Sequence, residues 1–439
     1  MTPWICLLLA FAPDSPVWPG FLGAGATPLA ADSLPLEWSP EKNIAWKSDL
    51  PGHGQSSPVI WGDKVFVTAV EGPMKDSYHV VCLSLADGTI RWKHSVASSD
   101  PVKNSVYVSR AAPTPVVDSQ GVYVYFESGD VVALDHAGQV RWQRSLTKDF
   151  GKPQNKFGLS ASPVQTEDRL VVLVDDEGPS YLIALRKADG VTLWKQDRTS
   201  RVSWSSPTIV VASGRPQVVC SSSGSVDGYS IETGEKLWSF DDVGGNSSAT
   251  PLPFADGRFL IGASAGREGQ NAEGARKSNM ALSVTQTDGR WTPQVVWRNE
   301  QVSPTFGSPI VYRDCAYWVN RAGVVYCLDA ATGKTHYTQR TKQSIWATPL
   351  GVGDRVYFFG KDGLTTVLAA GPEFKVLAEN QLWDPESVKP DAGAAEREDT
   401  EERRRAAAMF SGPVQYGVAA VDGSLLIRVG ERLYCVRSR

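Results

Sequence analysis

The feature that most constrains the fold is a short motif, a small residue followed by proline and an apolar run, that occurs eight times. The first copy is "SSPVI" (56–60), and the prolines of the eight copies are Pro58, Pro115, Pro163, Pro207, Pro251, Pro309, Pro349 and Pro413. Successive prolines are 57, 48, 44, 44, 58, 40 and 64 residues apart, so the base period is near 40–44 residues with insertions. Proline removes a backbone donor, which suits the start of a strand and not its middle. The motif therefore indicates eight repeated units, each beginning with a strand.

Each unit continues with further strands and a glycine turn. In the first unit, "KVFVTAV" (64–70) and "VVCLSL" (80–85) follow the proline strand, and "ADGTIRW" (86–92) ends the unit. Four units place tryptophan four residues after the turn glycine, and the sixth places Tyr337 there. Four short antiparallel strands per ~40–45 residues are typical of a β-propeller blade. No helical period separates the strands, which disfavours Rossmann and barrel folds; an array of β-sandwiches is the second choice.

The two ends of the chain complement each other. The last unit stops at "ERLYCVRSR" (431–439), which is a third strand, and no glycine turn with a tryptophan strand follows. The missing fourth strand is "EKNIAWKSDL" (41–50), centred on Trp46. We therefore predict an all-β, eight-bladed propeller of four-stranded antiparallel blades over residues 37–439. Its ring is closed by the N-terminal strand, which removes the free edges of a linear array.

The units "CLDAATGKTHY" (327–337), "YSIETGEKLW" (229–238) and "CLSLADGTIRW" (82–92) resemble the repeat of quinoprotein-type propellers, those related to pyrroloquinoline quinone (PQQ) enzymes. The resemblance covers about residues 37–439. It implies that the glycine turns the chain and that the tryptophan docks between neighbouring blades. The structural tryptophans expected from it are Trp46, Trp92, Trp142, Trp194, Trp238 and Trp297. Relatives such as the BamB component of outer-membrane protein assembly carry the same repeat without a cofactor.

Catalytic motifs are absent from the sequence. The resemblance implies that the family's enzymes use adjacent cysteines, calcium held by Glu, Asn and Asp, and a catalytic Asp, but no Cys-Cys dipeptide occurs and no acidic cluster stands out. There is no Gly-x-Ser-x-Gly, P-loop or HExxH motif. The six cysteines form no CxxC, so we predict no metal site. We expect a non-enzymatic protein without a cofactor; PQQ with calcium belongs only to the alternative enzyme.

The first 31 residues are predicted to be a signal or leader segment. The apolar run "WICLLLAFA" (4–12) is too short to span a bilayer but fits the apolar part of a secretory signal. The usual positive region is missing, because the first Lys or Arg is Lys42, and Cys6 lies too early for a lipid anchor. The net charge of −4 includes no basic block that would suggest nucleic acid. We expect a periplasmic or extracellular monomer without a transmembrane segment.

Nearly all the long insertions fall in two kinds of connection; the C–D turn of the fifth unit is the exception. In a four-stranded blade with strands A to D, the A–B and C–D turns share one face of the disc, and the B–C turns and D–A links share the other. The long segments, 71–79, 97–110, 146–158, 264–279 and 378–411, are all B–C turns or D–A links. They should crowd one face, as functional loops on a rigid scaffold do. Within the segment 378–411, residues 383–409 include eight acidic and five basic residues. It is predicted to be partly helical, with Asp399 and Glu402 as a capping box, either as a solvated surface helix or as a binding element.

Aromatic residues stand three positions before four of the eight prolines, where the chain approaches the central channel. They are Trp204, Phe306, Trp346 and Phe410, and Arg110 lies near the same mouth. These five are the candidate binding residues; the aromatics would stack a planar ligand or simply plug the channel. We predict a protein-binding or scaffolding propeller similar to BamB. The alternatives are a PQQ-dependent oxidoreductase and a carbohydrate-binding or adhesion propeller.

Overall fold

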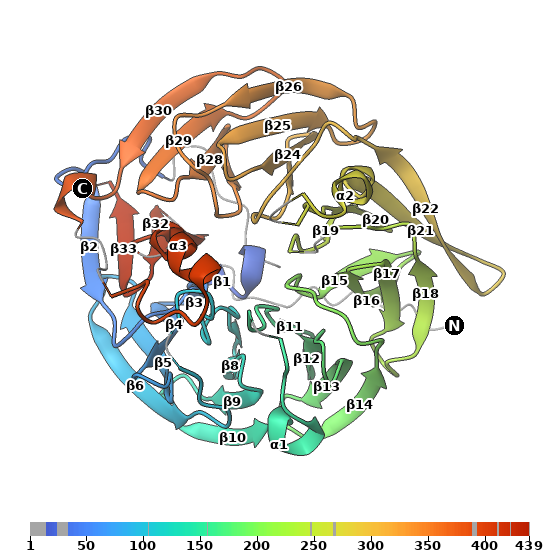
Figure 1. The fold of residues 1–439 in the computed structure, drawn as a ribbon, viewed down its shortest axis with the longest axis horizontal. Coiled ribbons are helices and arrows are strands. Elements are labelled where there is room, and N and C mark those ends of the chain that lie inside the picture. Colours follow the sequence, from blue (N-terminus) through green and yellow to red (C-terminus); the bar gives the residue numbers. More distant parts are fainter. Residues whose placement is uncertain are drawn as a thin grey trace.

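The computed structural model is a closed ring of eight β-sheets around a central channel (Figure 1). It describes residues 15–23, 34–103, 105–155, 157–245, 248–266, 269–388, 393–410, 412–421 and 423–438. Each sheet is a four-stranded antiparallel meander, and one gains a fifth strand from the N-terminal segment. The predicted eight-bladed propeller is confirmed.

The first four blades follow one another along the chain. Blade 1 contains β3 (Val59–Trp61), β4 (Lys64–Glu71), β5 (Ser77–Ser84) and β6 (Ile90–Ala97). Blade 2 contains β7 (Val116–Asp118), β8 (Gly121–Tyr125), β9 (Asp130–Leu134) and β10 (Val140–Ser145). Blade 3 contains β11 (Val164–Gln165), β12 (Arg169–Val174), β13 (Tyr181–Arg186) and β14 (Thr192–Asp197). Blade 4 contains β15 (Thr208–Ala212), β16 (Arg215–Ser222), β17 (Ser225–Ser230) and β18 (Lys236–Phe240).

The remaining blades complete the ring. Blade 5 contains β19 (Leu252–Ala255), β20 (Arg258–Ile261), β21 (Met280–Thr287) and β22 (Arg290–Arg298). Blade 6 contains β23 (Ile310–Tyr312), β24 (Cys315–Val319), β25 (Val324–Asp329) and β26 (Thr335–Arg340). Blade 7 contains β27 (Leu350–Val352), β28 (Arg355–Phe359), β29 (Leu364–Ala369) and β30 (Val376–Gln381). Blade 8 contains β31 (Gln415–Val421), β32 (Ser424–Val429), β33 (Arg432–Arg437) and β2 (Ile44–Asp49).

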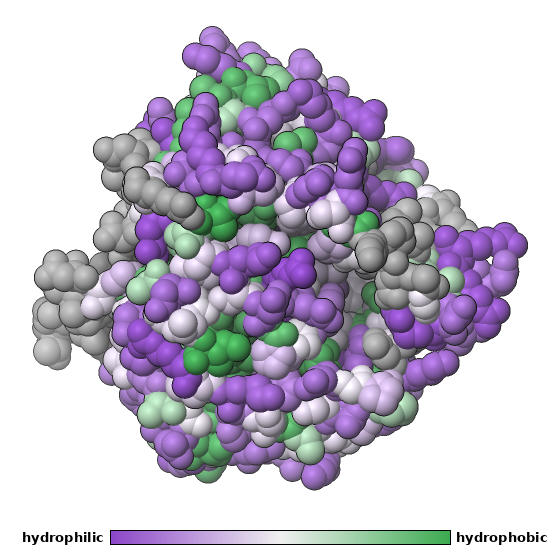
Figure 2. Space-filling model, turned by 90° about the vertical axis from the view of Figure 1, so that its left-hand side faces the viewer, coloured by the Kyte–Doolittle hydropathy of each residue, from purple (hydrophilic) through white to green (hydrophobic). Residues whose placement is uncertain are grey.

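Blade 8 is closed by the N-terminal strand, as the sequence predicted. β2 pairs antiparallel with β33, and Trp46 lies opposite Cys435 in the register. The side of the ring around β2 presents mainly hydrophilic residues, with apolar residues in small separate groups (Figure 2). The closing strand therefore completes the core without leaving a large apolar surface on this rim.

The hydrophobic core lies between neighbouring blades. The B and C strands are buried on both faces over most of their length, and Val65 to Val70 of β4 illustrate this with an unbroken buried run. The second half of β21 in blade 5 is the exception, since it extends into an exposed hairpin. The outermost strands alternate between buried and exposed residues, as in β14, where Trp194 is buried between more exposed neighbours. Blades stacked face to face explain why the inner strands are rich in valine and isoleucine, which suit a pleated surface covered on both sides.

The meander topology assigns the turns to two faces. We call the face with the A–B and C–D turns the short-turn face and the face with the B–C turns and D–A links the insert face. The insert face carries the helices α1 (Leu146–Phe150), α2 (Ala272–Lys277), η2 (Pro385–Ser387) and α3 (Glu401–Phe410). The N-cap of α3 differs from the predicted one: the Arg403 amide donates to Thr400 Oγ1 at 3.2 Å, so the helix begins one residue later than a cap at Asp399 would require.

The N-terminal segment supplies an unexpected strand. β1 (Val17–Trp18) and η1 (Phe21–Gly23) lie at the centre of the ring, and β1 pairs with the innermost strand of blade 1 (Figure 1). These residues fall inside the predicted leader segment 1–31, whose residues 1–14 and 24–31 lie outside the described part of the chain. A leader that ended at residue 31 would carry away this part of the fold.

Candidate functional site

The central channel holds a cavity of about 970 Å³. Its wall consists of the A strands and the residues that precede them, which come from all eight blades. At the insert face the wall ends in a mouth that includes Trp204, Phe306 and Trp346. Towards the short-turn face it is lined by Phe21 and Leu22 of the N-terminal segment. The cavity therefore has an aromatic mouth and an apolar floor.

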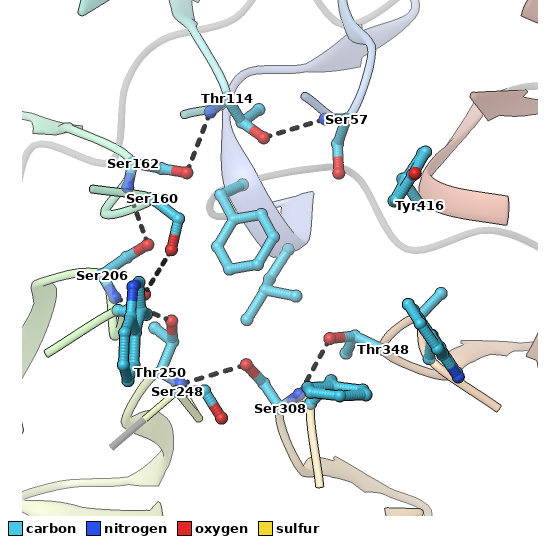
Figure 3. Close-up of a pocket in the computed structure, with 18 of the residues that line it drawn as sticks. Ser57, Thr114, Ser160, Ser162, Ser206, Ser248, Thr250, Ser308, Thr348 and Tyr416 are labelled. Atoms are coloured by element: carbon cyan, nitrogen blue, oxygen red, sulfur yellow. Dashed lines mark hydrogen bonds between the residues drawn. The ribbon is translucent and has the colours of Figure 1, made fainter. Parts of the chain in front are cut away.

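A ring of hydroxyl groups joins the blades around the cavity (Figure 3). The residue before the strand-starting proline is serine or threonine in blades 1 to 7. In blades 2 to 7 its hydroxyl accepts a hydrogen bond from the backbone N–H of the equivalent residue in the preceding blade. These bonds are 2.9–3.1 Å long and link Ser57, Thr114, Ser162, Ser206, Thr250, Ser308 and Thr348 in that order. In blade 8 the position is Gly412. The hydroxyls thus satisfy backbone donors that proline-containing strand starts leave without a ladder partner.

Three of the predicted aromatics line the same cavity, and two of them are in contact. The rings of Phe306 and Trp346 are 4.9 Å apart between centroids, and both residues line the cavity. On another part of the wall, Trp204 contacts Phe157 edge to face at 6.5 Å. Phe306 and Phe157 remain 38% and 39% exposed, so the mouth presents apolar surface to solvent. Phe410 is the last residue of α3, and its side chain lies outside the described part of the structure.

Arg110 does not present its charge to the cavity. Its guanidinium is buried and donates to the Asp100 carboxylate at 2.7 Å and to the Glu127 carbonyl at 3.2 Å. Its φ of +67° lies in the left-handed region, which few residues with side chains adopt. The loop bends here so that the side chain turns into the 97–110 insert. Arg110 thus holds an insert loop in place, a role that spacing from the proline could not reveal.

A buried acid lies beside this loop and borders the cavity. Glu127 is 1% exposed and accepts a hydrogen bond from the Ala112 amide at 3.3 Å. Burial raises its pKa to about 7, although Arg110 opposes the shift. Nearby, Lys75 donates from Nζ to the carbonyls of Ser105 and Val108, and burial lowers its pKa to about 8. Two ionisable groups with displaced pKa values therefore support the wall of the mouth.

The charged insert is anchored to the same side of the mouth. Glu398 is 2% exposed and accepts hydrogen bonds from the Ser105 hydroxyl and the Val106 amide, both at 2.9 Å. Tyr107 donates to the Arg403 carbonyl at 2.9 Å, and the Arg403 guanidinium lies 5.3 Å from the centre of the Tyr107 ring. The insert thus docks on the 97–110 loop, and Glu402 of α3 lines the cavity.

The six predicted structural tryptophans lie between blades or within them, away from the mouth. Five of them, all but Trp238, donate from Nε1 to a backbone carbonyl of the next blade, at 2.8–3.1 Å: Trp46, Trp92, Trp142, Trp194 and Trp297. The turn glycine of the next blade rests on the indole; a Cβ on Gly190 would lie 2.6 Å from the Trp142 ring. Trp238 bonds instead to Gln217 of its own blade, because the next blade has the long β21–β22 hairpin in place of the short glycine turn.

The residues present do not fit the calcium and PQQ set of the enzymes. Within the described ranges, no three His, Cys, Asp or Glu side chains are grouped closely enough to hold a metal ion. The cysteines that the structure describes are buried and free, and none adjoins another in the sequence. The acidic residues on the cavity wall are Glu127 and Glu402. We derive no chemistry through this cofactor.

Among the described residues, no helix has the length and apolar character needed to cross a bilayer.

A family model described as outer membrane protein assembly factor BamB matches residues 37–157, 154–252 and 280–429. The chain belongs to this family of PQQ-like repeat propellers. Among solved structures, BamB from Moraxella catarrhalis superposes with a TM-score of 0.58 at 13% identity, over 89% of this chain and 98% of that one. The designed protein Ika8 gives 0.56, also at 13% identity, over 90% of this chain and 99% of its own. These likenesses show the fold.

Curated relatives match shorter parts of the chain. BamB of Alkalilimnicola ehrlichii is 26% identical over 158 residues, 36% of each chain. BamB of Shewanella oneidensis is 25% identical over 255 residues, 53% of this chain and 58% of its own. A polyvinylalcohol dehydrogenase of a Pseudomonas species is 23% identical over 243 residues, 45% of this chain and 36% of its own. The matches thus span about a third to three fifths of each relative.

Proposed function

We propose that the protein is an exported, non-enzymatic propeller that binds another protein through its insert face, in the manner of an assembly or scaffolding factor. The observation that carries the proposal is the aromatic mouth. Phe157 and Phe306 expose more than a third of their surface beside a deep cavity. Exposed aromatic groups next to a pocket are the usual anchors of protein interfaces.

The construction of the insert face supports the same proposal. The 97–110 loop is held by the buried ion pair between Arg110 and Asp100, and the charged insert is held by Glu398. A surface fixed in this way loses little conformational entropy when a partner binds. Membership of a family described as an outer membrane protein assembly factor agrees with a protein partner. The same family description supports a location in the periplasm or outside the cell, which is part of this proposal.

The test is photo-crosslinking in the source cell. A photoreactive amino acid is placed at Met74, Phe157 or Phe306 on the insert face, and in matched variants at Val211 or Val376 beside the short turns. All five side chains are exposed to a similar degree, between 38% and 46%. We expect the three insert-face positions to give an adduct with one and the same protein, and the two control positions to give none.

A pair of double variants separates the surface from the fold. Phe157→Ser with Phe306→Ser should abolish the adduct formed from Met74 and leave the melting temperature within a few degrees of the wild type. Val211→Ser with Val376→Ser should leave the adduct intact. Adducts from the short-turn face alone, or none from any position in the folded protein, would contradict the proposal.

A further inference from the structure

The N-terminal segment enters the channel from the short-turn face as an extended peptide. Val17 lies opposite Trp61 and Trp18 opposite Ile60, in an antiparallel pair at the inner edge of blade 1. Figure 1 shows this strand at the centre of the ring, apart from the outer strand β2 that follows it in the sequence. A peptide that adds a strand to an open sheet edge is a known mode of recognition, and here the peptide belongs to the same chain.

Two hydrogen bonds hold the segment to two different blades. The Gly62 amide of blade 1 donates to the Pro16 carbonyl at 2.8 Å, and the Val117 amide of blade 2 donates to the Pro19 carbonyl at 2.9 Å. Both acceptors belong to prolines, which have a carbonyl but no N–H. The segment therefore accepts hydrogen bonds from the backbone N–H groups of both blades. At these two positions it has no N–H of its own that needs an acceptor.

Trp18 anchors the segment. It is 7% exposed and packs in the same core cluster as Ile60 and Val352. The chain then folds back over the indole at Gly23, whose φ is +67° and whose Cβ would lie 2.6 Å from the ring. A buried aromatic anchor flanked by prolines, with a glycine closing over it, has the features of a bound ligand and not of a passing linker.

The segment determines the shape of the cavity. Trp18, Phe21 and Leu22 line the same cavity of about 970 Å³ as the aromatics of the mouth. With the segment in place, the end of the channel at the short-turn face has an apolar floor, and the opposite end is the mouth on the insert face. Whatever enters the cavity then does so from the face that carries the inserts.

We propose that the inner edge of blades 1 and 2 is a peptide-binding site, and that residues 16–23 are its ligand within the same chain and are retained in the mature protein. Any leader removed on export then ends before Ser15, and not at residue 31. The segment closes the channel at the short-turn face. This inference does not depend on the proposed protein partner, because it concerns the opposite end of the channel.

The binding test uses the full chain with Trp18→Ala, which weakens the internal ligand, and a synthetic peptide of residues 15–23, SPVWPGFLG. In the wild type the attached segment competes at high effective concentration, so we expect the peptide to bind the variant at least tenfold more tightly. Exchange of the Gly62 and Val117 amides should be at least tenfold faster in the variant and should slow again when the peptide is added. The peptide with alanine in place of tryptophan serves as the control and should not bind.

Two further variants keep the test decisive. Gly23→Ala retains the tryptophan but places a methyl group against its ring, and it should open the site if Trp18→Ala does not fold. Trp291→Ala, in the outer hairpin of blade 5, is the control. It should leave the exchange rates of the Gly62 and Val117 amides unchanged, and it should not bind the peptide. Unchanged exchange at Gly62 and Val117 in both segment variants would overturn the proposal, as would equal binding of the control peptide.

The mass of the exported protein tests retention directly. Intact-protein mass spectrometry of the chain isolated after export should place its first residue at or before Ser15. A mature chain that begins after Gly23 would overturn the proposal.

Discussion

The two faces of the disc join the same blades by different means. At the short-turn face, tryptophan indoles lie against the turn glycines of the next blade and donate to its backbone, as Trp142 does to the Lys187 carbonyl. At the insert face, small hydroxyls each accept a hydrogen bond from one backbone N–H, as the Ser206 hydroxyl does from the Ser162 amide. The short-turn end of the channel has the N-terminal segment as its floor, and the insert end is the aromatic mouth. Because an indole buries far more apolar surface than a hydroxyl, we expect the short-turn face to contribute more to stability, and the insert face can then carry long loops.

The largest expected difference in stability is between a deletion that opens the ring and a deletion that only shortens the insert face. Deletion of residues 1–50 removes both β2 and the channel segment, and exposes the edge of β33. We expect aggregation or loss of cooperative unfolding, because an open sheet edge pairs with other chains. Deletion of 393–409 from the insert face should lower the melting temperature by only a few degrees. Thermal unfolding with size-exclusion chromatography checks both, and equal melting of the 1–50 deletion and the full chain would disprove the closure.

The tryptophan contacts at the short-turn face come next. Trp142→Ala and Trp194→Ala should each lower the free energy of unfolding by about 3–5 kcal/mol, as buried aromatics do. Trp92 is partly buried, so Trp92→Ala should cost less, about 2–3 kcal/mol. Urea unfolding measures the change. Losses below about 1 kcal/mol in all three would mean that these side chains do not hold the blades together.

Glu127 gives a pH-dependent effect at the insert face. Burial raises its pKa to about 7, so the folded state binds a proton more tightly than the unfolded state between pH 4.5 and 7. The stabilisation from its protonated form is therefore lost as the pH rises through this window. Relative to Glu127→Gln, the wild type should lose about 2–3 kcal/mol between pH 4 and pH 8. A constant difference between the two proteins across that range would show that the carboxyl titrates normally.

The hydroxyl ring should give the smallest effect. Ser162→Ala or Ser206→Ala leaves one buried backbone N–H, that of Thr114 or of Ser162, without its acceptor, which costs about 1 kcal/mol. Equilibrium unfolding of each variant, compared with Ser119→Ala at an exposed position in the A–B turn of blade 2, measures the cost. A loss as large as that of the tryptophan variants would remove the difference between the two faces.

The sequence predicts the fold well because its repeat records the blade geometry. The glycine turn and the tryptophan four residues later are contiguous, so the contact between blades is visible as spacing. The channel segment was not predicted, since "PVWPG" (16–20) occurs once and follows an apolar run typical of a leader. A serine or threonine before seven of the eight prolines is visible in the sequence, but its hydrogen-bond partner lies about one repeat away in the neighbouring blade. Arg110 was misplaced because a left-handed backbone turns its side chain into the loop.

Hydrogen exchange of the full chain, alone and in the complex isolated by crosslinking from Phe306, tests the central claim that the insert face makes the functional contacts. The account predicts slower exchange in 97–110, 146–158 and 264–279 when the partner is bound. It predicts no change in the A–B turns around Asp63 and Asp354. Protection confined to those turns, with the three insert segments unchanged, would contradict it.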